Sequence, residues 1–267
     1  MSSADPIGVF DSGVGGLSVW REVVRQLPSE NTLYFADQAH VPYGPRPVSA
    51  IRDYAKWITR FLLARGAKLI VVACNTASGA ALHHLRATFP EVPFVGMEPA
   101  VKPAAERTQS GIVGVIATPA TFQGTLFREL VRRFAAEVQL ETQVCPGLVE
   151  AVERGALETS HTLDLLHQCL DPLVAAGIDH LVLGCTHYPF LWKSIGSVMG
   201  PEITLVDPAP AVARQVERRL RENDLCAVEE QAPRHRFYTS GNPQRLAEMA
   251  QRLVGYKEPI HDVKLKT

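Results

Sequence analysis

Two cysteines lie in segments that resemble each other. The segment Leu69–Ser78 reads LIVVACNTAS and contains Cys74, and the segment His180–Pro189 reads HLVLGCTHYP and contains Cys185. In each segment a short aliphatic run predicts a buried strand, and a helix is expected after the cysteine. Ligands of α/β proteins bind beyond the carboxyl ends of such strands. The repeat therefore predicts two related lobes, each with a thiol where a ligand would bind.

The residues that follow the two cysteines suit an anionic ligand. Asn75, Thr76 and Thr186 carry neutral side chains that can donate hydrogen bonds to a carboxylate, and the first turn of a helix adds free backbone N–H groups. The positive end of the helix dipole lowers the pKa of a thiol at that position. His187 could orient or protonate a thiol or the substrate. Both segments therefore combine a nucleophilic or basic thiol with anion-binding groups.

A facing pair of thiols is typical of one reaction class. Removal of a proton from a chiral carbon on one face, with return on the other, needs two acid–base groups on opposite sides of a flat intermediate. A redox dithiol is the competing chemistry, but neither Cys74 nor Cys185 has a partner at C-x2-C spacing. A Cys–His hydrolase built on Cys185 and His187 is another alternative. It leaves Cys74 unused, and residues so close in the chain rarely form the required hydrogen bond.

A glycine-rich turn follows the first expected strand. The segment Phe10–Gly16 (FDSGVGG) contains Asp11 and Ser12, and its glycines would let backbone N–H groups approach an anion. As a dinucleotide-binding fingerprint it is incomplete, because Ser18 stands where the third glycine belongs. Asp37, at the end of the second expected strand, keeps a nucleotide-binding module as an alternative of a different class. A purely structural turn is the third interpretation.

Composition and charge restrict the classes of partner. Of the 267 residues, 46% are hydrophobic and 21% charged, and the net charge is -1, so no basic face for nucleic acid is expected. No apolar run approaches the ~20 residues of a membrane span, and Met1–Pro6 lacks the features of a secretory signal, which predicts a cytoplasmic protein. The cysteines lack the spacing of zinc sites or disulfide frameworks, so we expect no metal. We expect Cys145, Cys169 and Cys226 to be buried or incidental thiols.

Strands and helices are expected to alternate along the chain. The expected strands are Ile7–Phe10, Thr32–Ala36, Leu69–Ala73, Phe94–Met97, Ile112–Ala117, Val138–Val144, Leu181–Gly184, Ile203–Val206 and Arg236–Tyr238. The expected helices are Leu17–Leu27, Ile51–Leu62, a helix from Cys74 to Phe89, Thr121–Phe134, Gly147–Arg154, Leu163–Ala176, Ala211–Arg221 and Pro243–Leu253. The polar stretch Glu229–Arg234 is expected to be a loop. The alternation predicts an α/β protein with two similar parallel-sheet lobes and the active site in the cleft between them. We expect the first lobe to span residues 1–98 plus 209–267 and the second to span 99–208.

Together these motifs resemble the cofactor-independent aspartate/glutamate racemases. The resemblance covers nearly the whole chain and rests on four motifs: GVFDSGVGGL around Asp11, PYG at residues 42–44, ACNTAS around Cys74 and LGCTHYP around Cys185. The PYG motif and the histidine after Cys-Thr favour the glutamate branch of the family. A relative that acts on aspartate or another acid is the nearer alternative.

The resemblance implies a role for each matching residue. Cys74 would take the α-proton of D-glutamate and Cys185 that of L-glutamate, with Asp11 near the first thiol and His187 near the second. The residues implied to hold the substrate are Asp11, Ser12, Tyr43, Gly44, Asn75, Thr76, Thr186 and His187.

Four further positions belong to the same comparison. Glu153 matches a carboxylate of the family, and Thr118 and Thr121 fall in a matching turn that would contact the side-chain carboxylate of the substrate. Gly124 stands where the family pattern has a serine. This departure concerns a peripheral contact and leaves the implied chemistry unchanged.

The implied activity is interconversion of L- and D-glutamate with no cofactor: no pyridoxal phosphate, metal or nucleotide. In a bacterial cytoplasm this reaction would supply D-glutamate for peptidoglycan. The implied partner is the small-molecule substrate glutamate. The resemblance also allows a homodimer and activation by a cell-wall precursor, whereas no nucleic acid and no membrane are expected as partners.

Overall fold

The chain divides into two compact units. The computed structural model describes residues 2–134, 138–228 and 232–264, so part of the expected loop Glu229–Arg234 lies outside the described residues. Unit 1 comprises Met1–Met97 and Ala209–Thr267, and unit 2 comprises Glu98–Pro208. Within the described ranges, no helix is long and apolar enough to cross a membrane.

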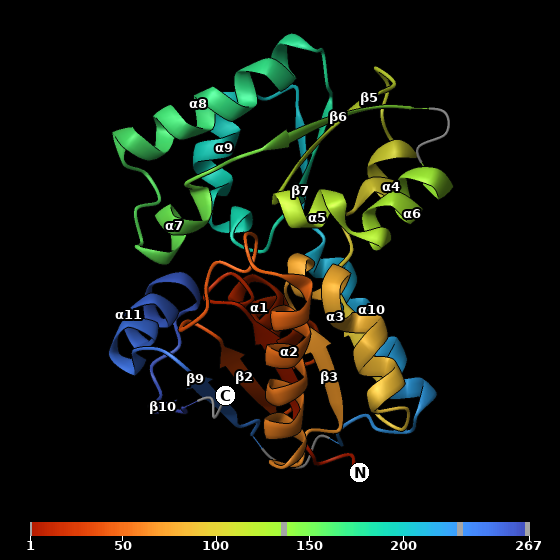
Figure 1. The fold of residues 1–267 in the computed structure, drawn as a ribbon, viewed down its shortest axis with the longest axis vertical. Coiled ribbons are helices and arrows are strands. Elements are labelled where there is room, and N and C mark those ends of the chain that lie inside the picture. Colours follow the sequence, from red (N-terminus) through yellow and green to blue (C-terminus); the bar gives the residue numbers. More distant parts are fainter. Residues whose placement is uncertain (1, 135–137, 229–231, 265–267) are drawn as a thin grey trace. The chain divides into compact units, whose positions relative to one another are not determined.

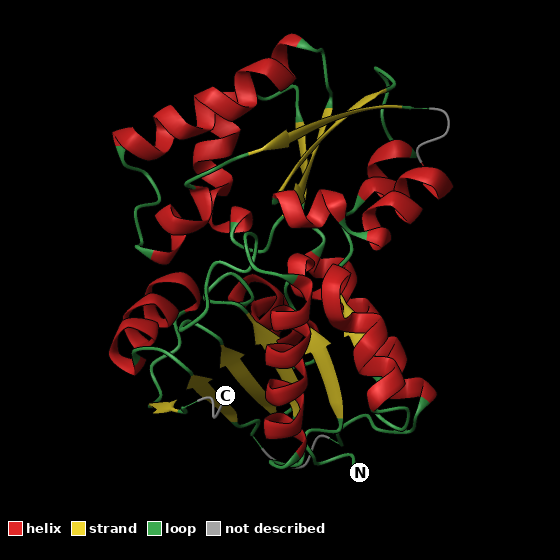
Figure 2. Cartoon of the chain, in the orientation of Figure 1, coloured by secondary structure: helices red, strands yellow, loops and turns green. Residues whose placement is uncertain are grey.

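Unit 1 is built on a six-stranded parallel sheet (Figures 1 and 2). In spatial order its strands are β10 (Ile260–Asp262), β9 (His235–Thr239), β2 (Thr32–Ala36), β1 (Ile7–Asp11), β3 (Leu69–Val72) and β4 (Phe94–Gly96). Every residue of β1, β2 and β3 is buried. Continuous burial is what a parallel strand experiences when helices cover both faces of its sheet.

Helices cover the two faces of this sheet. In the described part of unit 1 they are α1 (Leu17–Gln26), α2 (Val48–Leu63), α3 (Asn75–Thr88), α10 (Ala209–Glu222) and α11 (Pro243–Val254). α2 packs beside α3, and α1 packs beside α10. Phe35 of β2 lies in one core with Ile58 of α2, whereas the next residue back, Tyr34, contacts Phe237. The alternating directions of side chains along β2 thus fill both layers.

Unit 2 is built on a four-stranded parallel sheet. Its strands lie in the order β6 (Gln139–Val144), β5 (Ile112–Ala117), β7 (His180–Gly184) and β8 (Thr204–Val206). Its described helical elements are α4 (Val101–Ala105), α5 (Pro119–Gln123), α6 (Thr125–Phe134), α7 (Leu148–Glu153), α8 (Ser160–Ala175), the 3-10 turn η1 (Tyr188–Leu191) and α9 (Trp192–Met199). Val115 and Val182 of the sheet form a core with Val101 of α4 and Phe127 of α6.

The strand orders show that the two units share a topology. The order β2-β1-β3-β4 in unit 1 matches the order β6-β5-β7-β8 in unit 2. β3 and β7 therefore occupy equivalent places, and each is followed closely by one of the two cysteines of interest, Cys74 and Cys185. The prediction of two similar parallel-sheet α/β lobes is confirmed. The likeness of the two cysteine segments corresponds to a topological repeat.

Most expected strands and helices are confirmed to within three residues, and the differences have local causes. The expected helix Thr121–Phe134 is two helices, because Gly124 has an extended backbone (φ -65°, ψ 145°) that ends α5. The helix expected after Cys185 consists of the 3-10 turn η1 followed by α9. The element α4 was not expected, since its short proline-containing segment lacks clear helical spacing. β10 follows the last expected helix, in a polar tail for which no strand was expected, and it pairs with β9.

Candidate functional site

Cys74 lies at the start of α3, as predicted from the sequence. It is the N-cap residue of this 14-residue helix, and its Sγ accepts a hydrogen bond from the backbone N–H of Ala77 at 3.4 Å. The side chain is buried, with 5% exposed. The N-terminus of a helix carries partial positive charge, which favours a thiolate over a thiol. The local structure is therefore suited to a thiol that gives up its proton readily.

The turn after β1 brings a hydroxyl group to Cys74. Phe10 pairs with Val72, so counting two residues on along both strands places Ser12 opposite Cys74. The Cys74 Sγ and Ser12 Oγ atoms are 4.0 Å apart. The neighbouring Asp11 is fully buried and accepts a hydrogen bond from the N–H of Gly13 at 3.0 Å.

Glycine at position 16 permits this turn. A Cβ atom at Gly16 would lie 2.5 Å from Cβ of Asp11 and 3.0 Å from the hydroxyl of Tyr34, which donates to the carbonyl of Gly13 at 2.7 Å. Any larger residue would therefore displace the aspartate. The glycine-rich motif acts here by allowing close packing around a buried carboxylate.

Asn75 carries a side-chain amide for which the described residues supply no hydrogen-bond partner. Both Oδ1 and Nδ2 are buried and unpartnered, and the residue is 5% exposed. A buried amide without partners costs about 1–3 kcal/mol, so such groups are generally paired with a ligand or water. Thr76, which follows it, is also buried. The first turn of α3 thus offers both a donor and an acceptor beside Cys74.

Tyr43 is buried, and its phenol lies close to the ionisable side chains of Asp37, Cys74 and Asp11. Its hydroxyl donates to Oδ2 of Asp37 at 2.6 Å. Burial, the charge of Asp37 and smaller contributions from Cys74 and Asp11 raise the pKa of Tyr43 well above its ordinary value, so it remains a neutral phenol. Gly44 follows it and is half-buried.

In unit 2, Cys185 lies beside a histidine that is held by a carboxylate. The Sγ atom of Cys185 is 3.7 Å from Nδ1 of His187, and Nε2 of His187 is 2.8 Å from Oε1 of Glu153 in α7. All three side chains are buried. Burial alone would lower the pKa of His187, but its hydrogen bonds to Cys185 and Glu153 and the charges of both raise this pKa well above the ordinary value. The imidazole can therefore keep a second proton next to the thiol.

Two expectations about Cys185 were wrong. It does not begin an α-helix: Thr186 and His187 follow it, then the 3-10 turn η1, in which the N–H of Tyr188 bonds to the carbonyl of Cys185 at 3.1 Å. The tight turn bends the chain back, so His187 does reach the thiol two residues earlier. The objection to a hydrogen bond between neighbours in the chain therefore fails, whereas the objection that a hydrolase leaves Cys74 unused still holds.

Thr118 and Thr121 lie at the carboxyl end of β5. Thr118 caps α5, where its Oγ1 accepts from the N–H of Thr121 at 3.3 Å and is 2.9 Å from the hydroxyl of Thr121. Ala117 pairs with Gly184, so counting one residue on places Thr118 opposite Cys185. The repeat thus brings a hydroxyl-bearing residue to each cysteine, Ser12 in unit 1 and Thr118 in unit 2.

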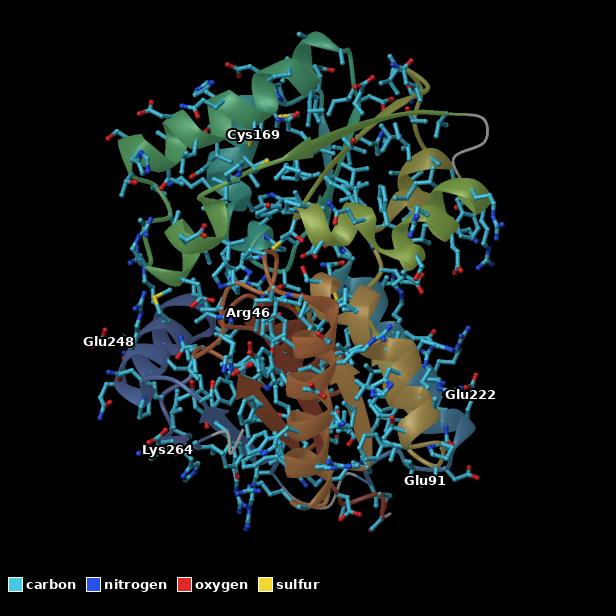
Figure 3. The ribbon with its side chains drawn as sticks, viewed as in Figure 1. Arg46, Glu91, Cys169, Glu222, Glu248 and Lys264 are labelled. Atoms are coloured by element: carbon cyan, nitrogen blue, oxygen red, sulfur yellow. The ribbon has the colours of Figure 1, made fainter. Side chains whose placement is uncertain are left out.

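The other cysteines differ in burial. Cys145 and Cys169 are buried, the latter on α8 (Figure 3), and the hydrogen bond between them, with burial, raises the pKa of Cys145 far above that of an ordinary thiol. Cys226 is exposed. The described residues contain no group of three or more His, Cys, Asp or Glu side chains that could hold a metal ion. Charged side chains such as Glu91 and Glu248 point outward in Figure 3.

The geometry around Asp37 argues against the nucleotide-binding alternative. A dinucleotide-binding domain uses the acidic residue after the second strand to bind the ribose hydroxyls. Here the carboxylate of Asp37 is fully buried and already accepts hydrogen bonds from His40, Tyr43 and Ser240. It has no exposed oxygen for a ribose, so the turn at Asp11 lacks the second half of a nucleotide site.

Comparison with known proteins identifies the family. Residues 7–216 match the family model described as Asp/Glu/Hydantoin racemase. The chain is 49% identical to the glutamate racemase of Ectopseudomonas mendocina, over 97% of this chain and 98% of that protein. Among solved structures, it resembles a glutamate racemase isoform from Bacillus anthracis (TM-score 0.88, 34% identity, 98% of both chains). It also resembles Escherichia coli glutamate racemase in complex with L-glutamate and the activator UDP-MurNAc-Ala (TM-score 0.87, 34% identity, 98% of this chain and 100% of that one). The resemblance read from the four motifs is thereby confirmed, and the chain belongs to the Asp/Glu/Hydantoin racemase family.

Proposed function

We propose that the protein interconverts L-glutamate and D-glutamate by proton transfer at the α-carbon between two cysteines. The observation that carries this proposal is the repeated position of a buried thiol, Cys74 after β3 and Cys185 after β7, in a chain about half identical to named glutamate racemases. A reaction that is symmetric about a flat intermediate needs two equivalent acid–base groups, and a duplicated fold supplies them.

The proton transfers balance without any other reactant. With D-glutamate, the thiolate of Cys74 takes the α-proton and becomes a thiol, leaving a planar carbanionic intermediate. The thiol of Cys185 then donates its proton to the opposite face, giving L-glutamate and a thiolate at Cys185. The reverse reaction begins with the thiolate of Cys185. Each cysteine must therefore serve as a thiolate in one direction of the reaction and as a thiol in the other.

The surrounding groups have roles that follow from their geometry. The helix N-terminus at Cys74 favours its thiolate, and the proton held by His187 between Glu153 and Cys185 can stabilise a thiolate there. The unpartnered amide of Asn75 can bind a carboxylate oxygen through Nδ2. We assign Asp11, Ser12, Tyr43, Gly44, Thr76 and Thr186 to the same substrate-binding set. Hydrogen bonds aimed at the substrate carboxylate stabilise the charge that develops in the transition state.

The biological setting is part of the proposal. D-glutamate produced in the cytoplasm would serve peptidoglycan synthesis, and the Escherichia coli relative was solved with the activator UDP-MurNAc-Ala. We infer that the racemase activity of this chain should be measured both with and without UDP-MurNAc-Ala. A homodimer stays a prediction, which sedimentation of the purified protein would decide.

The test is proton NMR of the purified protein in D2O with D-glutamate and then with L-glutamate, with reductant and no added cofactor. Loss of the α-proton signal from both enantiomers, with inversion seen by chiral analysis, is the expected result. Aspartate is the matched substrate control, because it differs by one methylene group. Exchange with aspartate but not glutamate, with UDP-MurNAc-Ala present and absent, would overturn the substrate assignment in favour of the related alternative.

A further inference from the structure

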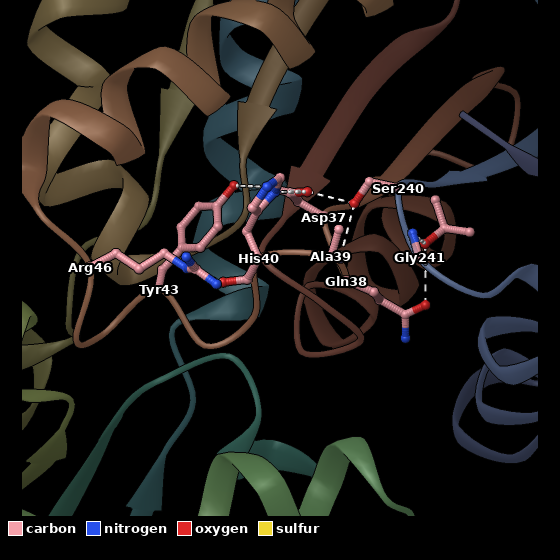
Figure 4. A network of polar contacts seen from close by, with 9 residues as sticks. Asp37, Gln38, Ala39, His40, Tyr43, Arg46, Ser240 and Gly241 are labelled. Atoms are coloured by element: carbon pink, nitrogen blue, oxygen red, sulfur yellow. Dashed lines mark hydrogen bonds and ion pairs between the residues drawn. The ribbon is translucent and has the colours of Figure 1, made fainter. Parts of the chain in front are cut away.

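Asp37, just after β2, has a fully buried carboxylate that accepts three side-chain hydrogen bonds (Figure 4). The donors are the hydroxyl of Tyr43 to Oδ2 at 2.6 Å, Nδ1 of His40 to Oδ1 at 2.8 Å, and the hydroxyl of Ser240 to Oδ1 at 2.5 Å. An ionised carboxylate can only accept, so all three partners must use a hydrogen on it. Asp37 therefore fixes the orientation of three side chains at once.

These bonds join two loops of unit 1 that are distant in the sequence. Ser240, after β9, also accepts a hydrogen bond from the N–H of Ala39 at 3.1 Å. The hydroxyl of Thr239 donates to Oε1 of Gln38 at 3.2 Å. A Cβ atom at Gly241 would lie 2.7 Å from Cβ of Gln38, so this glycine is needed for the loops to approach so closely. The start of the segment 37–46 is thus anchored to the neighbouring loop (Figure 4).

The far end of the segment 37–46 is closed by further contacts. The guanidinium of Arg46 donates to the carbonyl of His40, and its backbone N–H bonds to the carbonyl of Tyr43 at 3.0 Å. The ring of His40 stacks on Tyr54 of α2 with centroids 4.0 Å apart. Together with the bonds at Asp37, these contacts leave the turn at residues 42–44 little freedom.

The bond to Asp37 also determines what the phenol of Tyr43 can bind. A phenol has one hydrogen, and here the carboxylate holds it, so the oxygen can only accept from any other group. Cys74 and Asp11 are near enough that their charges raise the pKa of Tyr43. A group that approaches this oxygen from the side of Cys74 must therefore be a donor, such as a thiol or the ammonium group of an amino acid, and cannot be a carboxylate.

We propose that Asp37 is a positioning residue for the Cys74 half of the site: it holds the segment 37–46 in place and keeps the oxygen of Tyr43 as a hydrogen-bond acceptor. This inference rests on the proposed glutamate racemisation. The described side-chain partners of Asp37 are Tyr43, His40 and Ser240, and neither thiol is among them. Asp37 acts through Tyr43, so its loss should weaken substrate binding more than proton transfer.

The test compares the two ends of β2. Asp37→Ala removes the three-fold acceptor after the strand, whereas Glu30→Gln alters the buried carboxylate before it, which binds Lys68 at 2.6 Å and the N–H of Ala227 at 2.8 Å. Both variants should lower the Tm. Only Asp37→Ala should raise KM for both enantiomers, by about tenfold as for lost charged hydrogen bonds, while kcat changes less than about threefold. Tyr43→Phe should raise KM less, and Asp37→Asn should rescue part of the loss.

A second readout keeps the inference independent of the activity. Amide hydrogen exchange of the segment 37–46 should accelerate in Asp37→Ala and not in Glu30→Gln. If KM rises equally in both variants, or in neither while Tm falls in both, Asp37 is merely structural and the proposal is overturned. If the wild-type protein does not racemise glutamate, the proposed function fails, and unchanged exchange of the segment would overturn the positioning role as well.

Discussion

The two cysteines occupy equivalent places in the two units, yet their surroundings differ. Cys74 begins the helix α3 and accepts an N–H bond from Ala77. Cys185 precedes a 3-10 turn and contacts His187, which is bound to Glu153. A helix N-terminus offers a fixed partial charge, whereas a histidine–carboxylate pair offers a proton that can be gained and lost. In the proposed mechanism, two different kinds of charge would therefore act on the two thiols.

Each unit has a hydroxyl-bearing residue at the equivalent position on the strand next to its cysteine strand, but the contacts of the two hydroxyls differ. Continuing the register of each strand pair beyond its last paired residues places Ser12 opposite Cys74 and Thr118 opposite Cys185. Ser12 Oγ is 4.0 Å from the thiol, whereas Thr118 caps α5 and is bonded to Thr121. The repeated sheet fixes where each thiol lies. The turns after the strands, which differ in sequence, fix how the thiol is tuned.

Removal of either thiol is expected to have the largest effect. A serine hydroxyl is too weak an acid to exchange protons near neutral pH, so Cys74→Ser and Cys185→Ser should each lower kcat for both enantiomers by at least about a hundredfold. Circular dichroism follows the change in chirality. If either variant kept more than about a tenth of the wild-type turnover, the two units would not be equivalent partners, and the two-thiol scheme would be wrong.

Removal of the carboxylate beside His187 should affect only the Cys185 half, and less severely. In Glu153→Gln the charge of Glu153 no longer helps Cys185 to offset the desolvation of His187, so the pKa of His187 should fall and kcat should drop by about tenfold. The two enantiomers have equal free energies, so kcat/KM must fall equally in both directions. The deuterium isotope effect tells the halves apart: it should rise for α-deuterated L-glutamate and fall for the D enantiomer.

The same variant should change the pH dependence of stability. The raised pKa of His187 in the folded protein stabilises the fold fully below the ordinary value of about 6.5, and this contribution is lost as the pH rises through the folded-state pKa. Urea unfolding from pH 6 upward should therefore show a contribution that declines with pH and that is smaller in Glu153→Gln, where only Cys185 still raises the pKa of His187. An NMR titration in which His187 loses its proton below 6.5 in the wild type would contradict this assignment.

The sequence predicts most of the fold because its central strands β1, β2, β3 and β7 are buried along their whole length. Short aliphatic runs such as Leu69–Val72 have few alternatives to a parallel strand. The helix expected after Cys74 begins directly at the next residue, Asn75. The break at Gly124 and the turn after Cys185 were missed, since both depend on backbone conformations that periodicity does not encode.

The candidate site was predictable in its residue types and only partly in its contacts. The motifs around Cys74 and Cys185 draw attention to the carboxyl ends of β3 and β7, after which the two thiols lie. The bond of His187 to Glu153 joins residues 34 positions apart, and that of Asp37 to Ser240 joins residues 203 apart, so no local pattern contains either. Only the parallel order of the strands brings such residues to one edge of a sheet.

Removal of the Ser12 hydroxyl near Cys74 should lower the activity less than the loss of either thiol or of the Glu153 carboxylate. The 4.0 Å contact of Ser12 with the thiol is a weak hydrogen bond, so Ser12→Ala should lower kcat/KM by about threefold to tenfold. The isotope effect should now rise for α-deuterated D-glutamate, the reverse of the Glu153→Gln pattern. Thr118→Val is the matched change in unit 2, and it should also lower the Tm because it removes the cap of α5. If the deuterium isotope effects changed in the same way in Ser12→Ala and Thr118→Val, the Cys74 side and the Cys185 side of the site could not be assigned to different enantiomers.

The smallest effect is expected at the exposed thiol, and it separates accessibility from catalysis. Cys226 is exposed, whereas Cys74 and Cys185 are 5% and 7% exposed. Iodoacetamide should modify Cys226 first, with less than about a twofold loss of activity, and Cys226→Ser should remove this early phase, because access limits the reaction of buried thiols. Inactivation should then follow the slower modification of the two buried cysteines, which mass spectrometry of tryptic peptides can assign. Loss of activity in step with the early phase would mean that a thiol outside the repeated strand ends takes part, and the equivalence of the two units would no longer explain the chemistry.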